Sequence, residues 1–263
     1  MKKIVFFLAL LNFLTSTAQN KGIVYYGHIE SPGKGGPVGL DFNSYLVFDK
    51  SQSYYVTAKD SLENETNIEN QKIKKTDGQI TEIYVGKHTL TQGKQVYYNR
   101  EKDSIWWNKK YQTPVYGVEK RTEIPWKLIN ESKKIGNLLC KKATGTFRGR
   151  EYTAWYSTEI PLPYGPWKLQ GLPGLILEAY DTNKELYIYF KSVEYPVKKN
   201  IDLHPLTKTK DDKDLKWISL NEYNELLKAI VEKGKTKAIL MAKEYGVNVQ
   251  SGEMKDISIE IFD

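Results

Sequence analysis

Apolar and aromatic residues recur along most of the chain in short runs, and polar or glycine-containing residues separate one run from the next. The spacing of roughly ten residues is typical of an antiparallel meander, because alternating strands and helices need longer intervals. The run at 44–48 and the run at 53–57 flank a polar turn and predict a hairpin. The runs that predict strands lie at 23–29, 44–48, 53–57, 80–85, 95–98, 104–107, 115–118, 126–128, 137–140, 143–147, 152–156, 175–179 and 186–190.

One later segment has a helical period. Ser219 and Glu222 form a capping box, in which each side chain can bond the backbone N–H of the other residue at the start of a helix. Gly234 predicts a kink or a division of this helix, and Gly246 predicts its end. Residues 256–262 alternate in polarity and predict a closing strand. The apolar stripe of the helix consists of Leu220, Tyr223, Leu227, Ile230, Ala238, Met241 and Tyr245.

The last predicted strand of the sheet has two apolar faces. Leu186, Ile188 and Phe190 lie on one face, while Tyr187 and Tyr189 lie on the other. Both faces should therefore be covered. The helix can cover one face, and the other needs a second protein layer, a curled sheet or a ligand. The pattern predicts a mostly-β (α+β) fold, with a curved antiparallel sheet or half-barrel and one long helix in the C-terminal region.

The first residues have the layout of a secretory signal peptide. Lys2 and Lys3 precede an apolar run at 4–14, and Ser16 and Ala18 supply small side chains before a cleavage point. The run is too short for a spanning helix, and no other run reaches ~18 apolar residues. No cysteine follows it, so a lipid anchor is not expected. We expect export to the periplasm, with the extracellular space as the alternative, and no transmembrane segment after signal removal.

The sequence predicts a signal peptide at 1–18 and a single β-rich domain at 19–263. Within the domain, the stretch 59–79 is rich in Asn, Glu, Lys and Asp and holds few apolar side chains. Such a composition predicts a polar loop or insertion.

Composition and charge exclude several classes of function. The chain has 39 Lys and Arg against 32 Asp and Glu, and the lysines between 198 and 216 are interspersed with acids. This mixture predicts a solvated surface and no nucleic-acid partner. A single Cys excludes an internal disulfide, and with only three scattered His we expect neither a metal nor a cofactor. The aromatic content of 13% favours β-structure and contact surfaces.

The sequence motifs predict no catalytic residue. The chain has no G-x-S-x-G elbow, no H-E-x-x-H and no phosphate-binding glycine motif in a usable context. Cys140 precedes two lysines, but alternation along a strand favours a small buried side chain over a reactive thiol. His28, His88 and His204 lie far apart, and no pattern joins them to an acid or a nucleophile.

A rigid loop is predicted between two of the late strands. The stretch 161–174 holds four Pro and three Gly, which fix or free the backbone at many positions and exclude regular structure. Trp155, Tyr164 and Trp167 can fix this loop onto the sheet. The same aromatic side chains can border a binding mouth, so they are candidate ligand-binding residues.

Two arginines add a candidate anion site. Arg148 and Arg150 flank Gly149, which permits a tight turn. Each guanidinium can hold an anion with two hydrogen bonds. The alternative is that they pair with carboxylates at the sheet edge, such as Glu151 or Glu178.

The most specific motif is the hexapeptide formed by Gly171, Leu172, Pro173, Gly174, Leu175 and Ile176. Upstream residues extend the pattern: Cys140-Lys141-Lys142-Ala143, Phe147, Trp155-Tyr156, Ile160-Pro161 and Gly165-Pro166. On these residues the chain resembles the GLPGLI family of exported Gram-negative bacterial proteins, over about 139–179. The resemblance implies export and a β-rich domain but no catalytic residues, because the family has no established chemistry. The hexapeptide is interpreted as a structural signature, and the stretch 59–79 departs from the family pattern.

These observations favour a non-enzymatic periplasmic binding or accessory protein. Its aromatic surface would hold an apolar or peptide ligand, or an outer-membrane protein. One alternative is an exported hydrolase assembled from distant residues, such as one His with carboxylates, in a cleft that perturbs them. The other is a structural subunit of an envelope assembly, which requires a large exposed apolar patch.

Overall fold

The computed structural model describes most of the chain after the predicted signal peptide. The signal peptide at 1–18 and most of the predicted polar stretch 59–79 lie outside the described residues. Of that stretch, a short 3-10 turn at Asp60–Leu62 is described, and Lys72–Ile73 (β4) pairs with Ile83–Tyr84 (β5). The described residues are 21–63, 72–73, 83–84, 89–111, 113–198, 201, 203–246 and 258–262.

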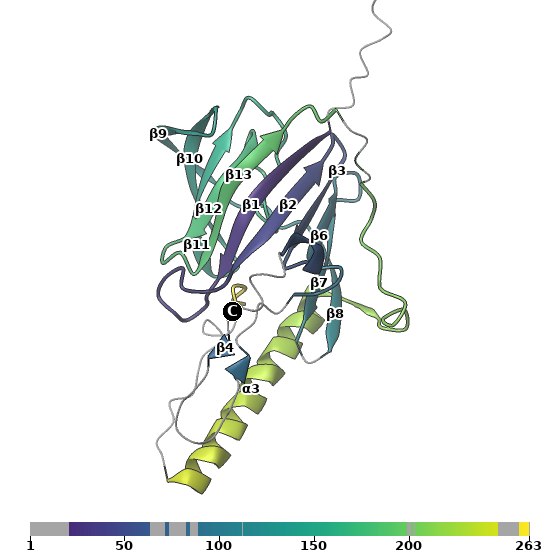
Figure 1. Ribbon diagram of the computed structural model, residues 1–263, viewed down its shortest axis with the longest axis vertical. Helices are drawn as coiled ribbons and strands as arrows, with labels where there is room; N and C mark the ends of the chain where they lie inside the picture. The colour runs from purple at the N-terminus through teal and green to yellow at the C-terminus, as the bar shows by residue number, and fades with distance from the viewer. Residues whose placement is uncertain are drawn as a thin grey trace, which may run out of the picture.

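The described fold is mostly β, with a twelve-stranded open sheet and one C-terminal helix (Figure 1). This confirms the prediction of a mostly-β chain with one long helix in the C-terminal region. The strands of the sheet are β1 (Gly22–Glu30), β2 (Asp41–Phe48), β3 (Gln52–Thr57), β6 (Lys94–Asn99), β7 (Ser104–Lys110), β8 (Pro114–Lys120), β9 (Lys127–Ile135), β10 (Leu138–Phe147), β11 (Arg150–Ser157), β12 (Leu175–Asp181), β13 (Leu186–Glu194) and β14 (Trp217–Ile218). The predicted hairpin is β2 with β3, and the two runs predicted at 137–140 and 143–147 form the single strand β10.

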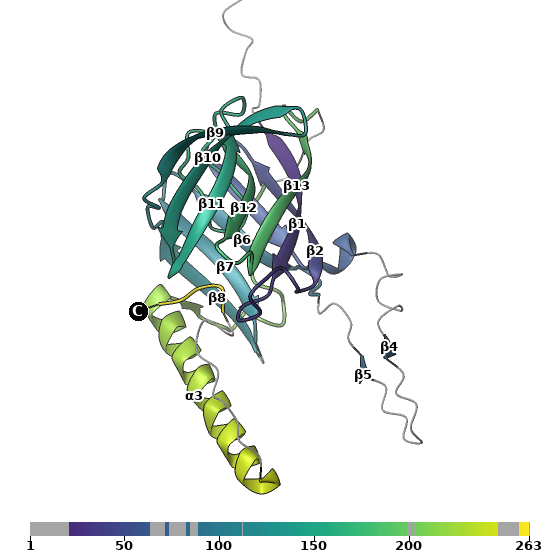
Figure 2. The same cartoon turned by 90° about the vertical axis from the view of Figure 1, so that its left-hand side faces the viewer.

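Two meanders build the sheet. The spatial order is β14-β8-β7-β6-β3-β2-β1-β13-β12-β11-β10-β9, so β1 and β13 join one meander to the other. The pairs are antiparallel except for β14, which was not predicted and which pairs parallel to β8. The connection 121–126 links β8 to β9, although these strands lie near opposite ends of the order. Figure 2 shows β11 and β12 in front of β6 and β7.

The predicted crossing loop lies against one face of the sheet, which we call the core face. Val24 and Tyr26 of β1 point to this face and belong to a hydrophobic cluster that also includes side chains of β7 and β12. The loop contributes Tyr164, whose ring lies 6.1 Å from that of Phe48 on β2, and Trp167, 5.7 Å from that of Phe147 on β10. The second layer over the core face is therefore this loop, a segment of the protein itself.

Helix α3 (Leu220–Tyr245) begins with the predicted capping box and ends at Gly246, whose φ of 64° is left-handed. It continues through Gly234, so the prediction of a kink or division there is wrong. Nothing lies within 4 Å of a side chain built at Gly234, so the glycine meets no packing demand that would bend the helix. Tyr223 and Leu227 are buried, whereas the later turns stand away from the sheet (Figure 1). No helix in the described ranges is both long and apolar enough to span a membrane.

The closing strand predicted at 256–262 is not formed in the described part, 258–262. This segment lies as irregular chain at one end of the core face, where the backbone N–H of Ile261 donates to the carbonyl of Arg148 at 3.0 Å. Burial does not alternate along this segment as it would along a strand. Ile259 is buried in the hydrophobic cluster, and its neighbour Glu260 is also buried, in a polar environment.

Candidate functional site

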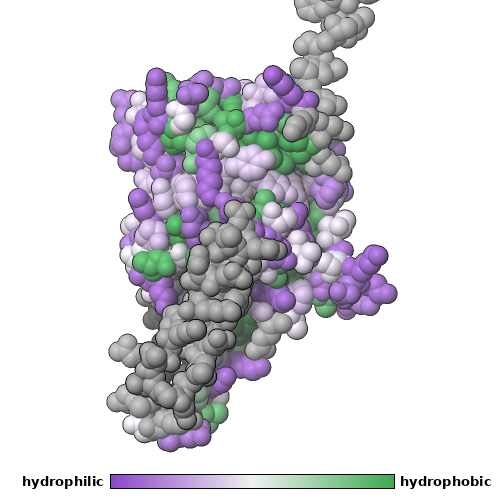
Figure 3. Space-filling model, viewed as in Figure 1, coloured by the Kyte–Doolittle hydropathy of each residue, from purple (hydrophilic) through white to green (hydrophobic). Residues whose placement is uncertain are grey.

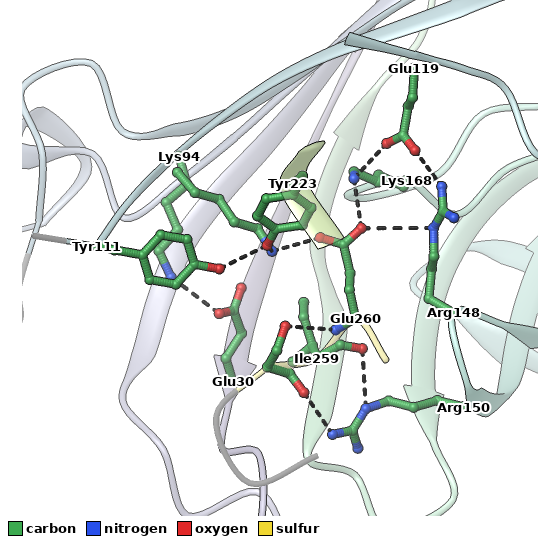
Figure 4. A network of polar contacts seen from close by, with 12 residues as sticks. Glu30, Lys94, Tyr111, Glu119, Arg148, Arg150, Lys168, Tyr223, Ile259 and Glu260 are labelled. Carbon is green, nitrogen blue, oxygen red and sulfur yellow. Dashed lines mark hydrogen bonds and ion pairs between the residues drawn. The ribbon is translucent and has the colours of Figure 1, made fainter. Parts of the chain in front are cut away.

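The segment 258–262 places a fully buried carboxylate, Glu260, at the end of the core face (Figure 4). Lys109 of β7 lies 2.7 Å from its Oε2 atom, and Lys168 of the crossing loop lies 2.6 Å from its Oε1 atom. Arg148, in the turn between β10 and β11, has its Nε atom 3.9 Å from the same Oε1. We call Lys109, Arg148 and Lys168 the carboxylate clamp.

A second carboxylate orients two members of the clamp. Glu119 of β8 forms an ion pair with Lys168 at 2.6 Å and accepts a hydrogen bond from a terminal nitrogen of Arg148. Its side chain is only 2% exposed, so its charge lies in the same low-dielectric region as Glu260. Three cations thus face two anions, and removal of Glu260 would leave an excess of two positive charges.

Helix α3 supplies the wall beside Lys109. The Lys109 ammonium donates to the hydroxyl oxygen of Tyr223 at 3.0 Å, and the hydroxyl groups of Tyr111 and Tyr223 lie 2.8 Å apart. The Tyr223 ring packs edge-on against Trp107 and against Phe262 of the bound segment. The first turns of α3 therefore fix both the clamp and its occupant.

Arg150 holds the backbone of the same segment. Its guanidinium donates to the carbonyl oxygens of Ser258 and Ile259, at 3.1 Å each. Asp181 and Glu185 each lie 2.7 Å from its Nη1 atom and compensate its charge. Arg148 therefore faces the side-chain charge of the segment 258–262, and Arg150 binds its main-chain carbonyl groups.

The clamp keeps Glu260 ionised. Burial opposes ionisation, but the charges of Lys109 and Lys168 more than offset it and lower the pKa of Glu260 to about 2. Burial likewise disfavours the charged form of Lys109, yet Glu260 raises the pKa of this ammonium well above its usual value. Each partner is therefore charged because the other is present.

A second buried polar group lies on the core face next to the clamp. His28 bonds the Tyr55 hydroxyl with Nδ1 at 2.6 Å and Glu30 with Nε2 at 2.9 Å, and Lys94 pairs with Glu30 at 3.1 Å. Burial opposes ionisation of Glu30, but Lys94 and His28 hold its pKa well below its usual range. The hollow between this group and Lys168 measures only about 20 Å³. Both imidazole nitrogens are engaged, so neither is available to a substrate in this arrangement.

The structure brings the two predicted arginines to one site. Arg148 and Arg150 flank the turn at Gly149, and both face the segment 258–262. The carboxylates that pair with them are Glu119, Asp181 and Glu185, whereas Glu151 and Glu178 had been suggested.

The three predicted aromatic residues lie in the protein interior. Tyr164 is fully buried, and Trp155 and Trp167 are each 7% exposed. The Lys133 ammonium lies 4.4 Å from the centre of a Trp155 ring. Tyr164 and Trp167 hold the crossing loop against the sheet, and a ligand-binding role for the three aromatic residues stays a prediction. Cys140 is buried too, and burial raises the pKa of its thiol to about 11, far from the range of a reactive cysteine.

The hexapeptide connects the crossing loop to β12. Leu172, Leu175 and Ile176 are buried, and Pro173 is exposed. Gly171 has a φ of 98°, a backbone conformation that L side chains rarely adopt. Gly174 is not in this region; it is required because a Cβ atom there would collide with the backbone carbonyl of Ser157.

Sequence reasoning missed Lys109, Glu119, Lys168 and Glu260 as site residues. A signal for two of them exists, because Lys109 follows Ile105 and Trp107 at the buried phase of a strand, and Glu119 follows Val115 at the same phase. A charged side chain on the buried side of a strand requires a partner in the interior that pairs with its charge. Within the described residues no cluster of His, Cys, Asp and Glu is arranged to hold a metal ion.

Among known protein families, one family model matches part of the chain. A family model described as a protein of unknown function (Porph_ging) matches residues 147–178, a region that includes Arg148, Arg150 and Lys168. No curated protein sequence matches the chain. Two solved structures of PNGF-II, in space groups P21 and C2, are similar with TM-scores of 0.46 and 0.45 and identities of 15% and 14%. Each match covers 78% of this chain and 32% of that chain, so this chain spans about a third of their length.

Proposed function

We propose that this protein is a non-enzymatic binding protein for an extended peptide segment that carries a carboxylate. The observation that supports this proposal is the fully buried Glu260, held by Lys109 and Lys168 at 2.7 and 2.6 Å. In this structure the site is occupied in cis, by the chain's own segment 258–262. The physiological ligand is a segment of another protein that competes for the same clamp.

The site has the features that recognise such a segment. The clamp selects one acidic side chain, because a neutral side chain would leave buried cations uncompensated. Arg150 selects main-chain carbonyls, and the place occupied by Ile259, which is 3% exposed, selects an apolar side chain next to the acid. The preferred ligand therefore has an acidic residue between apolar residues.

We further propose that the sheet is a half-barrel that holds this site at one end. The six residues of the connection 121–126 reach at most about 24 Å from Lys120 to Lys127. In a flat sheet the ten strand spacings from β8 to β9 would separate these strands by about 48 Å. A curled sheet brings the two strands within reach and supports the half-barrel.

The cellular setting of the proposal rests on the sequence. The layout of residues 1–18 supports export to the periplasm, and residues 171–176 support membership of the GLPGLI family. The ligand is then an acidic segment of an envelope protein, such as one in the outer membrane.

The test removes the Glu260 carboxylate from the clamp and then supplies a carboxylate on a separate peptide. The variant Glu260→Ala leaves Lys109, Arg148 and Lys168 without their central anion, so its melting temperature should fall. A synthetic peptide with the sequence of residues 256–263 should restore the melting temperature, with a stabilisation of about 2.7 kcal/mol at a hundredfold excess over Kd.

The matched control is the same peptide with Glu260→Gln. We expect little or no stabilisation by this control, because it lacks the charge that the clamp binds. Equal stabilisation by both peptides, or by neither, would contradict the proposal. If the variant does not fold, the same pair of peptides is compared on Glu260→Gln protein, which keeps the shape of the side chain.

A further inference from the structure

The opposite face of the sheet carries a second concave site. An open cleft of about 440 Å³ lies over β1, β2 and β3, with Tyr25, Tyr45 and Tyr54 among its lining residues. These side chains alternate with the core-face residues of the same strands, so the cleft and the carboxylate clamp lie on opposite faces. The cleft is thus independent of the proposed peptide site.

The three tyrosines lie on neighbouring strands and together line the floor of the cleft. Tyr25 is paired directly with Tyr45 across β1 and β2, and Tyr54 is paired with Val47, one position along the same face from Tyr45. Adjacent strands are about 4.8 Å apart, so the three residues are close neighbours on this face. Tyr25 is 42% exposed, and Tyr45 and Tyr54 are partly exposed.

Polar side chains of both signs surround this floor. Lys59, Glu194 and His204 line the cleft, and the ring of His204 lies 5.9 Å from that of Tyr54. Glu194 and His204 are exposed, and Lys59 is partly exposed. In Figure 3 the middle of the face over β1 and β2 is pale to purple, and a green hydrophobic band lies above it.

We propose that this cleft binds a neutral saccharide, with sugar rings stacked on Tyr25, Tyr45 and Tyr54. A pyranose ring has C–H groups on its faces and hydroxyl groups around its edge. Tyrosine offers the matching combination of a ring face and a polar tip. The rim residues Lys59, Glu194 and His204 supply donors and acceptors for the hydroxyl groups.

Other classes of ligand fit the cleft less well. The Lys59 charge is balanced by Glu194, so the rim does not favour an anion. Aliphatic side chains also line the cleft, namely Ile23, Val47, Leu62, Val197 and Ile201. An alkyl chain that packs on them would cover the tyrosine hydroxyls and the charged side chains without giving them hydrogen-bond partners. An extended peptide gains affinity by adding to a free strand edge, but β1, β2 and β3 are interior strands with both edges paired. The class of ligand that fits best is one recognised through its ring faces and its hydroxyl groups.

The test measures saccharide binding to the full chain by saturation-transfer NMR. The probes are maltose, cellobiose and N,N′-diacetylchitobiose, with 3′-sialyllactose as the acidic control and dodecanoate as the apolar control. We expect saturation transfer to ring protons of at least one neutral disaccharide, and its displacement by neither control. Binding of none of the three, or displacement by dodecanoate, would overturn the proposal.

Three variants locate the site. Tyr25→Ala and Tyr45→Ala should each weaken binding of that disaccharide by at least tenfold. Tyr187→Ala is the matched control, since Tyr187 lies in the neighbouring aromatic group of β13, with its ring 5.4 Å from that of Tyr189, and does not line the cleft. Unchanged affinity in both cleft variants, or an equal loss in Tyr187→Ala, would contradict the assignment.

Discussion

At the scale of single residues, Glu260 determines the electrostatics of the core face. Its pKa is about 2 in the folded chain and near 4.5 when exposed, so its stabilising contribution is complete above pH 4.5. This contribution is lost as the pH falls from about 4.5 toward 2. The difference corresponds to on the order of 3 kcal/mol at neutral pH.

The variant Glu260→Gln should therefore change the pH dependence of stability. At pH 7 we expect a loss of about 3–5 kcal/mol, because Lys109 and Lys168 become buried charges without a central partner. The gap between variant and native protein should narrow as the pH falls from 4.5 to 2, measured by urea unfolding. Glu131→Gln, in an exposed pair with Lys142, should leave the curve nearly unchanged. Parallel curves for Glu260→Gln and native protein would show that the clamp is not a charge-dependent contact.

Two glycines of the hexapeptide should respond to substitution for different reasons. Gly174→Ala should cost about 1–3 kcal/mol, because the new Cβ collides with the Ser157 backbone. Gly171→Ala should cost about 1–2 kcal/mol, because its φ of 98° disfavours a side chain, although the added Cβ meets only Trp126, at 3.9 Å. Gly36→Ala, with no neighbour within 4 Å, is the control and should change stability by less than about 0.5 kcal/mol. Chemical denaturation measures all three, and a neutral Gly174→Ala would refute the close approach.

At the scale of elements, α3 combines an anchored start with a free remainder. Tyr223 and Leu227 are buried against the sheet, whereas Ile239, Leu240 and Met241 are about half exposed. The stability of the later turns therefore depends on helix propensity more than on packing.

Gly234→Ala should raise the helical content of α3. The substitution removes a residue that costs about 1 kcal/mol in a helix interior, and nothing lies within 4 Å of the added Cβ. Amide exchange in the later turns of α3 should slow by about fivefold, measured by mass spectrometry. Gly246→Ala should have the opposite effect, because the C-cap has a left-handed φ of 64°. No change in either variant would mean that packing, not propensity, holds these turns.

The elements that sequence analysis predicted are those with a local cause. Strand alternation located the twelve-stranded sheet apart from β14, and the capping box located the start of α3. The two-residue β14 has no period of its own, since it is defined by pairing with β8. Residues 258–262 imitate a strand pattern, but their position depends on partners from β7, the turn between β10 and β11, and the crossing loop.

At the scale of the whole molecule, the carboxylate clamp joins segments that are remote in sequence. Two features of the fold bring these residues together: β8 connects directly to β9, and the crossing loop lies on the core face. The residues that converge are Lys109, Arg148, Lys168 and Tyr223. The sequence marks the arginine turn as a candidate anion site, with pairing to sheet-edge carboxylates as the alternative, because two arginines beside a glycine are a local signal. Lys168 and Glu260 could not be assigned, because only the folded sheet brings them together.

Under the proposed function, segment 258–262 occupies a site that another acidic segment can take. The most direct measurement is hydrogen–deuterium exchange of the native full chain, with and without the peptide of residues 256–263. The amide of Ile261, bonded to the Arg148 carbonyl at 3.0 Å, should exchange at least tenfold faster at saturating peptide, and the peptide with Glu260→Gln should have no effect. Unchanged protection of Ile259, Glu260 and Ile261 at saturating peptide would contradict the claim and leave Glu260 as a fixed part of the fold.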